Sequence, residues 1–443
     1  MTHTDLIIIG SGPGGYQAAA YAARQGLQVV IAEERLAGGT CLNCGCIPTK
    51  ALVHDAEKAT GNPTEGASLL QAAIHRKDQL VSAMRSGVEA LLHQPAITSI
   101  QGHASFLTPN TVKIGDTVYT AKDVIIATGS RAKMPPVEGL SPEEVLANPH
   151  VLTSEELLSQ TVLPHHLCIV GAGVIGLEMA SVFRAMGSEV TVIEFMKECL
   201  PAIDQEIARR LRKALEKRGV TFHMGCSLQR IDRDNVTYSN LKKGTSETLQ
   251  ADCILVATGR QANVEGLGLE NISVNVDKRG IEVDNNMQTA APHIYAIGDV
   301  NGRQMLAHAA TFQGYRAVNH ILGKTDHIRF DIMPAAVFTQ PEVASVGLTE
   351  DICKQQGNDF SVHKAIYRAN GRAQAAEATD GLLKLVCDSK GKIVGAHALG
   401  QDAAWLVQEA ASLMNLDVTL DRLAEIVHIH PTLAEILLDA ASH

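Results

Sequence analysis

The sequence predicts an α/β fold with two Rossmann-like dinucleotide-binding domains and a separate C-terminal α+β domain. Two segments that each run from an apolar strand through a glycine-rich turn into a helix predict the first two domains. From Pro334 onward, short apolar strands precede amphipathic helices, which predicts the third domain. Because 443 residues exceed the usual size of one hydrophobic core, about three domains are expected.

The elements are expected in the following order. An apolar strand begins at Asp5 and ends in GSGPGG, and an alanine-rich helix continues through Ala23. Residues 62–92 show helical periodicity, and residues 98–127 are typical of strands joined at glycine turns. The second strand, turn and helix unit spans 167–180. In the last domain we expect strands at 336–338, 383–386 and 393–398, and helices at 403–414 and 419–427.

Gly10, Gly12 and Gly15 match the GxGxxG pattern of a dinucleotide-binding turn. The first glycine permits the tight turn, the second lets the backbone approach a pyrophosphate, and the third lets the helix pack on the strand. The phosphates would lie at the N-terminus of the helix, where its dipole favours negative charge. Glu33, which follows the strand 29–32, is placed to accept the ribose hydroxyls.

The second unit has the same parts in the same order. Its glycines are Gly171, Gly173 and Gly176, and Glu194 ends the next strand, VTVIE. A carboxylate at that position repels a 2′-phosphate, so NAD is favoured over NADP. One GxGxxG match is a weak signal, because glycine turns recur structurally. Two complete sets predict two dinucleotides bound side by side, one of which can be a flavin.

The composition is that of an ordinary globular protein, with 45% hydrophobic and 19% charged residues. A net charge of -10 without basic runs argues against nucleic-acid binding. The apolar run from Leu6 to Ile9 is too short to span a bilayer, so we expect no signal peptide, no membrane anchor and a cytoplasmic location. Because the cytosol keeps thiols reduced, the nine cysteines predict no structural disulfide framework, and any disulfide should be catalytic.

Two cysteines, Cys41 and Cys46, lie five positions apart in GGTCLNCGCIPTK. An ideal helix would separate their α-carbons by roughly 8 to 9 Å, which exceeds the usual reach of a disulfide. The backbone must therefore leave the helical conformation between them, and Gly45 makes this easier. A pair held in this way beside a flavin would be reducible and functional.

Cys44 leaves alternatives open. It forms a CxxC spacing with Cys41, which allows a different disulfide, or it packs as a small apolar side chain. A zinc site from Cys41, Cys44 and Cys46 would lack a fourth ligand and a second matching pair, so no metal is predicted. The other cysteines are expected mostly in the core: Cys168, Cys199, Cys226, Cys253, Cys353 and Cys387.

The segment 38–50 resembles the active-site motif of the pyridine nucleotide-disulfide oxidoreductases. Further landmarks of that family cover essentially the whole chain: ATGS at 127–130, ATGRQAN at 257–263, YAIGDV at 295–300, MLAHAA at 305–310 and HIHPTLAE at 428–435. The resemblance implies FAD and NAD as cofactors, and a C-terminal α+β dimerisation domain. The expected boundaries are 1–145 for the first part of the FAD-binding domain, 146–263 for the NAD-binding domain, 264–328 for the return to the FAD and central domain, and 329–443 for the dimerisation domain.

The resemblance also implies roles for individual residues. Cys41 would be the thiol that attacks the substrate, and Cys46 would be the charge-transfer thiol beside the flavin. Lys50 would lie near the flavin N5, paired with Glu178, although an ordinary surface pair is the alternative. Asp299 would bind the ribityl or phosphate region. Further contacts to the cofactors are expected from Gly39, Thr40, Ala104, Ser130, Gly259 and the backbone of Leu306 and Ala307.

His430 matches the base of the family, contributed by the other subunit of a homodimer, with Glu435 orienting its imidazole. The chemistry explains the need, because the thiolate is the nucleophile and a base that moves the proton accelerates exchange. For the nearby His428 we expect only a local hydrogen bond.

Within the family, the resemblance is strongest to the lipoamide dehydrogenase branch, through CLNCGCIPTKALV, GVIGLEM, NGRA at 370–373 and HPTLAE. It implies oxidation of dihydrolipoamide by NAD, with the lipoyl domain of a 2-oxo acid dehydrogenase or glycine cleavage complex as partner. Two departures argue against that substrate assignment: Ala309 and Gln313 stand where the branch usually has lysine and glutamate. The alternatives are a flavoprotein that reduces reactive oxidants, suggested by CIPTKALVHDA, and a silent flavin-binding scaffold.

Overall fold

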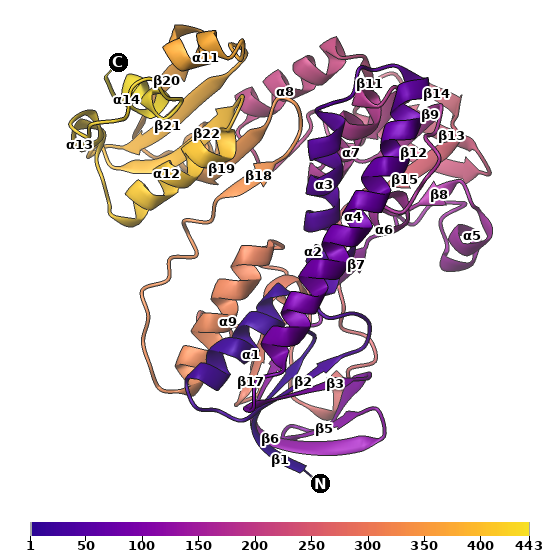
Figure 1. Ribbon diagram of the computed structural model, residues 1–443, viewed down its shortest axis with the longest axis vertical. Helices are drawn as coiled ribbons and strands as arrows, with labels where there is room; N and C mark the ends of the chain where they lie inside the picture. Colours follow the sequence, from indigo (N-terminus) through magenta and orange to yellow (C-terminus); the bar gives the residue numbers. More distant parts are fainter. Residues whose placement is uncertain (1, 443) are drawn as a thin grey trace.

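The computed structural model describes residues 2–442 and has the α/β architecture that the sequence predicts. Figure 1 shows two Rossmann-like domains, one at the bottom with the N-terminus and one at the upper right, and a third domain at the upper left with the C-terminus. Met1 and His443, the outermost positions of the first and last predicted domains, lie outside the described residues.

The first domain is built on a seven-stranded sheet of mixed direction. In spatial order its main path is β3 (Ile97–Gln101), β2 (Val29–Glu33), β1 (Thr2–Ile9), β6 (Thr117–Ile126), β5 (Thr111–Ile114) and β4 (Ala104–Thr108). β1, β2, β3 and β6 are parallel, whereas β4, β5 and β6 pair antiparallel. The run Leu6–Ile9 is buried on both faces of the sheet, as expected for a central parallel strand.

The chain comes back to this sheet after the second domain. β17 (Ile294–Ala296) pairs parallel with β6, and the η2 turn (Gly298–Asn301) leads on to α9 (Ala307–Ile321). α9 packs beside α1 (Pro13–Arg24), almost 300 residues earlier, where the Tyr21 hydroxyl donates to Asn319 at 2.8 Å. The late glycine-aspartate motif and the early glycine turn therefore belong to one domain.

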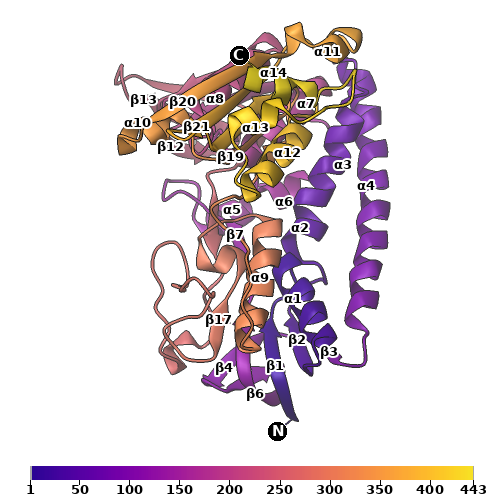
Figure 2. The same cartoon turned by 90° about the vertical axis from the view of Figure 1, so that its left-hand side faces the viewer.

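Three helices connect the first domain to the second. They are α2 (Gly39–Cys44), α3 (Cys46–Ala56) and α4 (Pro63–Leu92). α4 begins where Asn62 accepts a hydrogen bond from the Thr64 amide and Pro63 occupies the first helical turn. Figure 2 shows α4 running along much of the molecule, with the shorter α3 beside its upper part. At Gly66 it touches the second domain so closely that an added Cβ would lie 1.7 Å from the Met186 carbonyl oxygen.

The second domain has a parallel five-stranded sheet and an antiparallel meander. The sheet runs β11 (Val220–Met224), β10 (Glu189–Glu194), β9 (His166–Val170), β15 (Cys253–Val256) and β8 (Val151–Leu152), and the meander is β12 (Cys226–Asp232), β13 (Asn235–Asn240) and β14 (Ser246–Gln250). The helices are α5 (Pro142–Ala147), α6 (Ser154–Leu157), α7 (Val174–Ala185) and α8 (Gln205–Lys217). A two-stranded ribbon of β7 (Ser130–Ala132) and β16 (Arg260–Ala262) joins the two Rossmann-like domains, and the η1 turn (Leu269–Asn271) follows.

The third domain is an antiparallel sheet covered by short helices. Its strands are β18 (Ala335–Val337), β19 (Val343–Gly347), β22 (Ile393–Leu399), β21 (Leu382–Asp388) and β20 (Phe360–Ile366). Its helices are α10 (Glu350–Gln356), the η3 turn (Tyr367–Ala369), α11 (Gly371–Ala375), α12 (Ala403–Asn415), α13 (Leu420–Ala424) and α14 (Glu435–Ser442). The helix predicted over 419–427 was too long. It starts one residue after the capping Thr419 and ends at Ala424, because the amides of Glu425 and Ile426 bond to carbonyls only three residues back and tighten the last turn.

A buried ion cluster joins α8 to this third domain. The Lys384 ammonium on β21 lies 2.8 Å from Asp204 and 2.6 Å from Glu350, and Lys384 and Asp204 are 1% and 0% exposed. Burial acts to lower the pKa of Lys384, but hydrogen bonds to Asp204 and Glu350 outweigh it and raise the pKa. Among the described helices, none is long and apolar enough to cross a membrane.

Candidate active site

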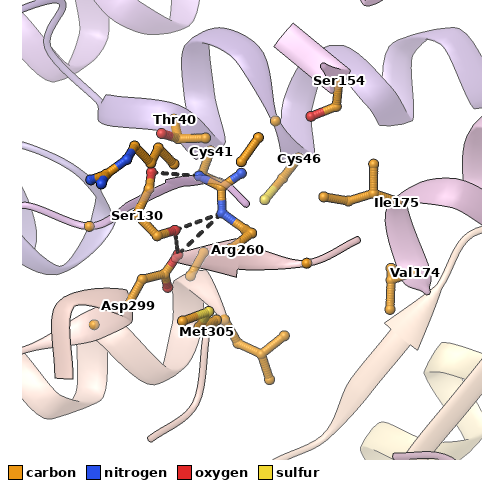
Figure 3. A pocket seen from close by; sticks show the side chains of 18 of the residues that line it. Thr40, Cys41, Cys46, Ser130, Ser154, Val174, Ile175, Arg260, Asp299 and Met305 are labelled. Carbon is orange, nitrogen blue, oxygen red and sulfur yellow. Dashed lines mark hydrogen bonds and ion pairs between the residues drawn. The ribbon is translucent and has the colours of Figure 1, made fainter. Parts of the chain in front are cut away.

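One cavity of 2680 Å³ lies where the three domains meet. Its wall includes both glycine turns, the predicted cysteine pair, the ends of β2 and β10, and the start of α9. Figure 3 shows side chains from α2, α3, α7 and the chain around Asp299 converging on it. The structure therefore brings together motifs that lie far apart in the sequence.

The first glycine turn has the geometry predicted for a pyrophosphate cradle. Gly10 has φ of 102°, a conformation that favours glycine, and an added Cβ would lie 2.4 Å from the Ala127 carbonyl oxygen. At Gly12 an added Cβ would meet nothing within 4 Å, so the backbone faces open space in the cavity. At Gly15 it would lie 1.9 Å from the Gly10 carbonyl oxygen, so the helix packs directly on the strand end.

The second glycine turn repeats this construction. Gly171 has φ of 110°, Gly173 faces open space, and a Cβ on Gly176 would lie 2.1 Å from the Gly171 carbonyl oxygen. The N-termini of α1 and α7 have no side-chain cap, which leaves their first amides available to an anion. Both turns fit dinucleotide phosphates.

A carboxylate stands beside each turn. Glu33 accepts hydrogen bonds from the Ser11 amide and hydroxyl, each at 2.8 Å, and from the Arg35 amide at 2.9 Å. Glu194 accepts from the amides of Ala172 at 2.6 Å and Met196 at 2.7 Å. These bonds fix both carboxylates on the turns where the sequence predicts ribose recognition.

The backbone between Cys41 and Cys46 leaves the helix at Gly45, as predicted. α2 ends at Cys44, Gly45 has φ of -140° and ψ of -110°, and α3 begins at Cys46. A Cβ on Gly45 would lie 2.9 Å from the Thr40 carbonyl oxygen. This break replaces a continuous helix, whose geometry would hold the two thiols apart.

The pKa values of the two thiols in this pair are shifted in opposite directions. A hydrogen bond from the Cys41 thiol is the main cause that lowers the pKa of Cys46 to about 7; burial opposes it and the Lys50 ammonium assists it. The pKa of Cys41 is raised by that same hydrogen bond, by burial and by the charge of Cys46. Cys46 also begins α3, where a thiolate is favoured. In the reduced pair, Cys46 is therefore the thiol that loses its proton first.

The Lys50 and Glu178 pair is not an ordinary surface pair. The Lys50 ammonium lies 2.9 Å from both carboxylate oxygens, and Glu178 is only 3% exposed. Glu178 also accepts the Phe338 amide at 2.9 Å, and the Phe338 ring centroid lies 4.7 Å from the Lys50 nitrogen. The pair is thus held from three sides, by α3, by α7 and by the segment after β18.

Cys44 points to a different neighbourhood from that of the pair. Burial first, and then the charge of Glu155, raise its pKa to about 11, while Arg35 acts in the opposite direction. Arg35 and Glu155 form an ion pair next to it. The Cys44 thiol is therefore protonated at neutral pH and packs beside a salt bridge.

Asp299 belongs to a polar cluster on one wall of the cavity. Its carboxylate accepts the Ser130 hydroxyl at 2.5 Å and lies 3.7 Å from the Arg260 guanidinium, which also donates to the Ser130 hydroxyl and carbonyl at 2.6 Å (Figure 3). Leu306 and Ala307 form the uncapped start of α9. The other predicted contacts also line the cavity: Gly39, Thr40, Ala104 and Gly259.

These residues fit FAD in chemistry as well as in space. An uncapped helix and an open glycine suit phosphates, Glu33 and Asp299 are acceptors for hydroxyls, and the start of α9 offers free amides. Gly39 lets α2 pack closely on the first glycine turn, since a Cβ there would lie 2.6 Å from the Gly12 α-carbon.

His430 and Glu435 form a pair of their own, away from the cysteines. His430 Nδ1 lies 2.9 Å from Glu435, whose other oxygen accepts the Thr432 amide at 2.8 Å. The backbone amide first, and then the imidazole, lower the pKa of Glu435. The His430 side chain is 78% exposed, and Figure 1 shows α14 well separated from α2 and α3. Neither His430 nor Glu435 is among the residues that line the cavity of Cys41 and Cys46.

The His428 side chain, by contrast, is 4% exposed and makes one local and one distant contact, so the expectation of a local hydrogen bond alone was incomplete. Its ring nitrogens lie 2.8 Å from the Ile426 carbonyl and 3.0 Å from Glu409. Among the cavity residues that the sequence analysis did not single out are Lys77, Arg260 and Phe338. Arg260 belongs to the ATGRQAN motif, which could have indicated its role. Lys77 lies in a helical segment and Phe338 in a strand-like segment, and neither segment carries a motif that points to the cavity.

Comparisons with known proteins agree with this architecture. Residues 4–314 match the family model "Pyridine nucleotide-disulphide oxidoreductase", and residues 333–441 match its dimerisation domain. The chain is 38% identical to dihydrolipoyl dehydrogenase 1, mitochondrial, of Arabidopsis thaliana, over 99% of this chain and 89% of that protein. It is also 38% identical to dihydrolipoyl dehydrogenase of Chlamydia muridarum, over 99% and 96%.

A solved structure with the same fold is the HOCl-induced flavoprotein disulfide reductase RclA from Escherichia coli. It has a TM-score of 0.88 and 30% sequence identity, over 99% of both chains. Its Cu(II) complex has a TM-score of 0.89 at the same identity, over 100% of this chain and 99% of that one.

Proposed function

Because this chain belongs to the pyridine nucleotide-disulphide oxidoreductase family, we propose that it oxidises dihydrolipoamide with NAD through a Cys41–Cys46 disulfide. One observation carries the proposal: Cys41 and Cys46 face a single cavity that also holds both dinucleotide turns and the ion pair of Lys50 with the buried Glu178. A dithiol centre between two cradles suits electron transfer from a thiol substrate to a nucleotide.

FAD would be held by Gly10, Gly12 and Gly15 at its pyrophosphate, by Glu33 at a ribose and by Asp299 along its ribityl chain. The start of α9 would meet the pyrimidine edge. When bound, the flavin supplies a two-electron carrier between the dithiol and the pyridine nucleotide. The chain itself supplies the sulfur chemistry and the proton transfers.

The exchange begins on Cys41. A substrate thiolate attacks the Cys41 sulfur of the oxidised pair, forms a mixed disulfide, and releases Cys46 as a thiolate. The second substrate thiolate then attacks the substrate sulfur of that mixed disulfide, so cyclic lipoamide leaves and Cys41 is reduced. The low pKa of Cys46 supports this order, since the better leaving group is the sulfur that is released first.

His430 of the partner subunit would accept the substrate proton. Its exposure and its distance from the cysteines of its own chain support a role across a dimer interface, and the matching dimerisation-domain model supports a homodimer. Glu435 holds Nδ1, which leaves Nε2 free to take a proton.

NAD is proposed as the acceptor because Glu194 stands where a 2′-phosphate would lie. Its carboxylate is fixed by two amides and almost buried, so it cannot swing away from a second negative charge. A lipoyl domain of a 2-oxo acid dehydrogenase or glycine cleavage complex is the proposed donor of the dithiol.

The test is the initial rate of NADH formation from dihydrolipoamide and NAD by the FAD-saturated protein. C41S is the control for thiol chemistry and must remove the rate. A scaffold would show no such rate, while its assembly would survive C41S. NADP in place of NAD should give a much lower kcat/KM.

A second candidate is reduction of an oxidant or another disulfide with a pyridine nucleotide as electron donor. The match over nearly the whole length of RclA favours it, as do Ala309 and Gln313. Both are buried on α9, and Gln313 accepts the Gly298 amide at 2.7 Å, so a neutral amide fills the place of the usual carboxylate. NADH oxidation with an oxidant, without turnover of dihydrolipoamide, would select this function.

A further inference from the structure

A short segment of the third domain lies directly on α7. After β18, the Phe338 amide donates to Glu178 at 2.9 Å, and the Gln340 amide donates to the Ser181 hydroxyl at 3.1 Å. Glu178 and Ser181 are three residues apart and therefore on the same helix face. The Gln340 side chain is held in turn by Arg218 at 2.8 Å. This double attachment fixes where the Phe338 ring lies.

The ring faces the Lys50 ammonium at 4.7 Å from its centroid, inside the range of a cation–π interaction. The Lys50 side chain is 33% exposed, so it has room to leave its position if nothing covers it. A long lysine side chain gains rotamer freedom when it moves into solvent. The carboxylate of Glu178 and the ring of Phe338 oppose that movement from different sides.

The position of the Lys50 ammonium matters because its charge acts on the Cys46 thiol. The charged or titratable groups that act on Cys46 come from three elements: Cys41 on α2, Lys50 on α3 and Glu178 on α7. Among these, Lys50 supplies the positive charge that favours the thiolate, and Glu178 opposes it. The stability of the Cys46 thiolate therefore depends on its distance from the Lys50 ammonium. This dependence is stronger while the Glu178 carboxylate stays in place.

We propose that Phe338 is a positioning residue for the redox centre, whose ring holds the Lys50 ammonium where it stabilises the Cys46 thiolate. This deepens the proposed function, because it rests on Cys46 and Lys50 acting beside the flavin. It also gives the third domain a part in the thiol chemistry of its own chain, in addition to dimerisation.

The test uses F338L in the FAD-bound, reduced protein. Leucine keeps the backbone amide that binds Glu178 and fills part of the volume, but it removes the π face. Iodoacetamide is added between pH 5 and 9, and tandem mass spectrometry measures the rate of labelling at Cys46. We expect the midpoint of the rate profile to rise by about half a pKa unit, which makes labelling roughly threefold slower near pH 6.

F338Y is the conservative variant and should keep the profile of the natural protein, because it retains the ring. F330L is the matched control: the Phe330 ring lies 5.1 Å from the Arg316 guanidinium, so it removes a similar pair outside the cavity. If F338L lost FAD or its folded state, F338M would take its place.

Unchanged Cys46 profiles in F338L and F338M would overturn the proposal, as would an equal shift in F330L or in F338Y. The assay contains neither dithiol substrate nor pyridine nucleotide. A protein that fails to oxidise dihydrolipoamide can therefore still show the shift, so failure of the proposed function and failure of this inference are distinguishable.

Discussion

Replacing Lys384 with methionine should destabilise the protein strongly, although the residue lies outside the cavity. The ammonium is 1% exposed and lies within 3.5 Å of three carboxylates, those of Asp204, Glu206 and Glu350. Methionine keeps the length of the side chain and removes its charge. Asp204, which is fully buried, would then keep a negative charge without its cation.

The expected loss follows from that uncompensated charge. Removing one partner of a buried ion pair costs about 3–5 kcal/mol. Two backbone amides at the start of α8, those of Glu206 and Ile207, still donate to Asp204, which offsets part of the loss. We therefore expect K384M to lower the free energy of unfolding by about 3 kcal/mol, at the lower end of that range.

The assay is urea unfolding followed by circular dichroism, with saturating FAD in every sample. The control is R422M, which breaks the Arg422–Glu425 pair, whose side chains are 69% and 67% exposed, and should cost about 0.5 kcal/mol or less. The double variant K384M/D204N should recover much of the loss, because asparagine still caps α8. A K384M loss no larger than that of R422M would refute the reasoning.

The loss should also depend on pH in a defined direction. Lys354 first, and then Lys384, lower the pKa of Glu350 to about 2 from the usual 4.5. A carboxylate with a depressed pKa contributes stability above its unfolded value and loses it as the pH falls toward the folded value. The difference between K384M and the natural protein should thus be largest at neutral pH and shrink between pH 4.5 and about 2.

Further predictions concern the cavity. C46S should abolish the long-wavelength absorbance between thiolate and flavin, and in the natural protein that band should grow as the pH rises through about 7; a band that survives in C46S contradicts the assignment. H430Q should lower kcat for dithiol oxidation by about 10²–10⁴, and E435Q by less, measured as NADH formation; a normal rate in H430Q removes it as the base. G12A should fold but lose FAD, since its methyl group enters open space in the first cradle. G173A should keep FAD, read from its absorbance, and raise KM for NAD roughly tenfold.

The sequence was sufficient for features that a short segment determines. Each glycine of GxGxxG has its own backbone requirement, so the spacing of the motif alone assigns separate tasks to Gly10, Gly12 and Gly15, and the fold class is confirmed. The break at Gly45 followed from the reach of a disulfide alone. Such predictions succeed because the physical constraint acts within a few residues.

The sequence could not reveal contacts made between distant segments. Lys384 is a charged residue in the apolar strand LLKLVCD, and the sequence alone would place it at the surface. Its partners Glu350 and Asp204 lie 34 and 180 residues away in the sequence. Phe338 belongs to a strand-like stretch in which an aromatic side chain is ordinary core. Their roles depend on which domain packs on which, and strand periodicity carries no information about that.

The two dinucleotide turns also differ in a way that bears on the order of binding. At the first turn, Gly39 of α2 packs against Gly12, and a Cβ on Gly14 would lie 3.1 Å from Ala310 of α9. Two elements therefore enclose the first turn. At the second turn, Val174 is 43% exposed and faces the cavity (Figure 3). An enclosed cradle slows release of its ligand, whereas an open one permits exchange. The first turn is thus suited to a cofactor that stays through many cycles, and the second to a nucleotide that enters and leaves in each one.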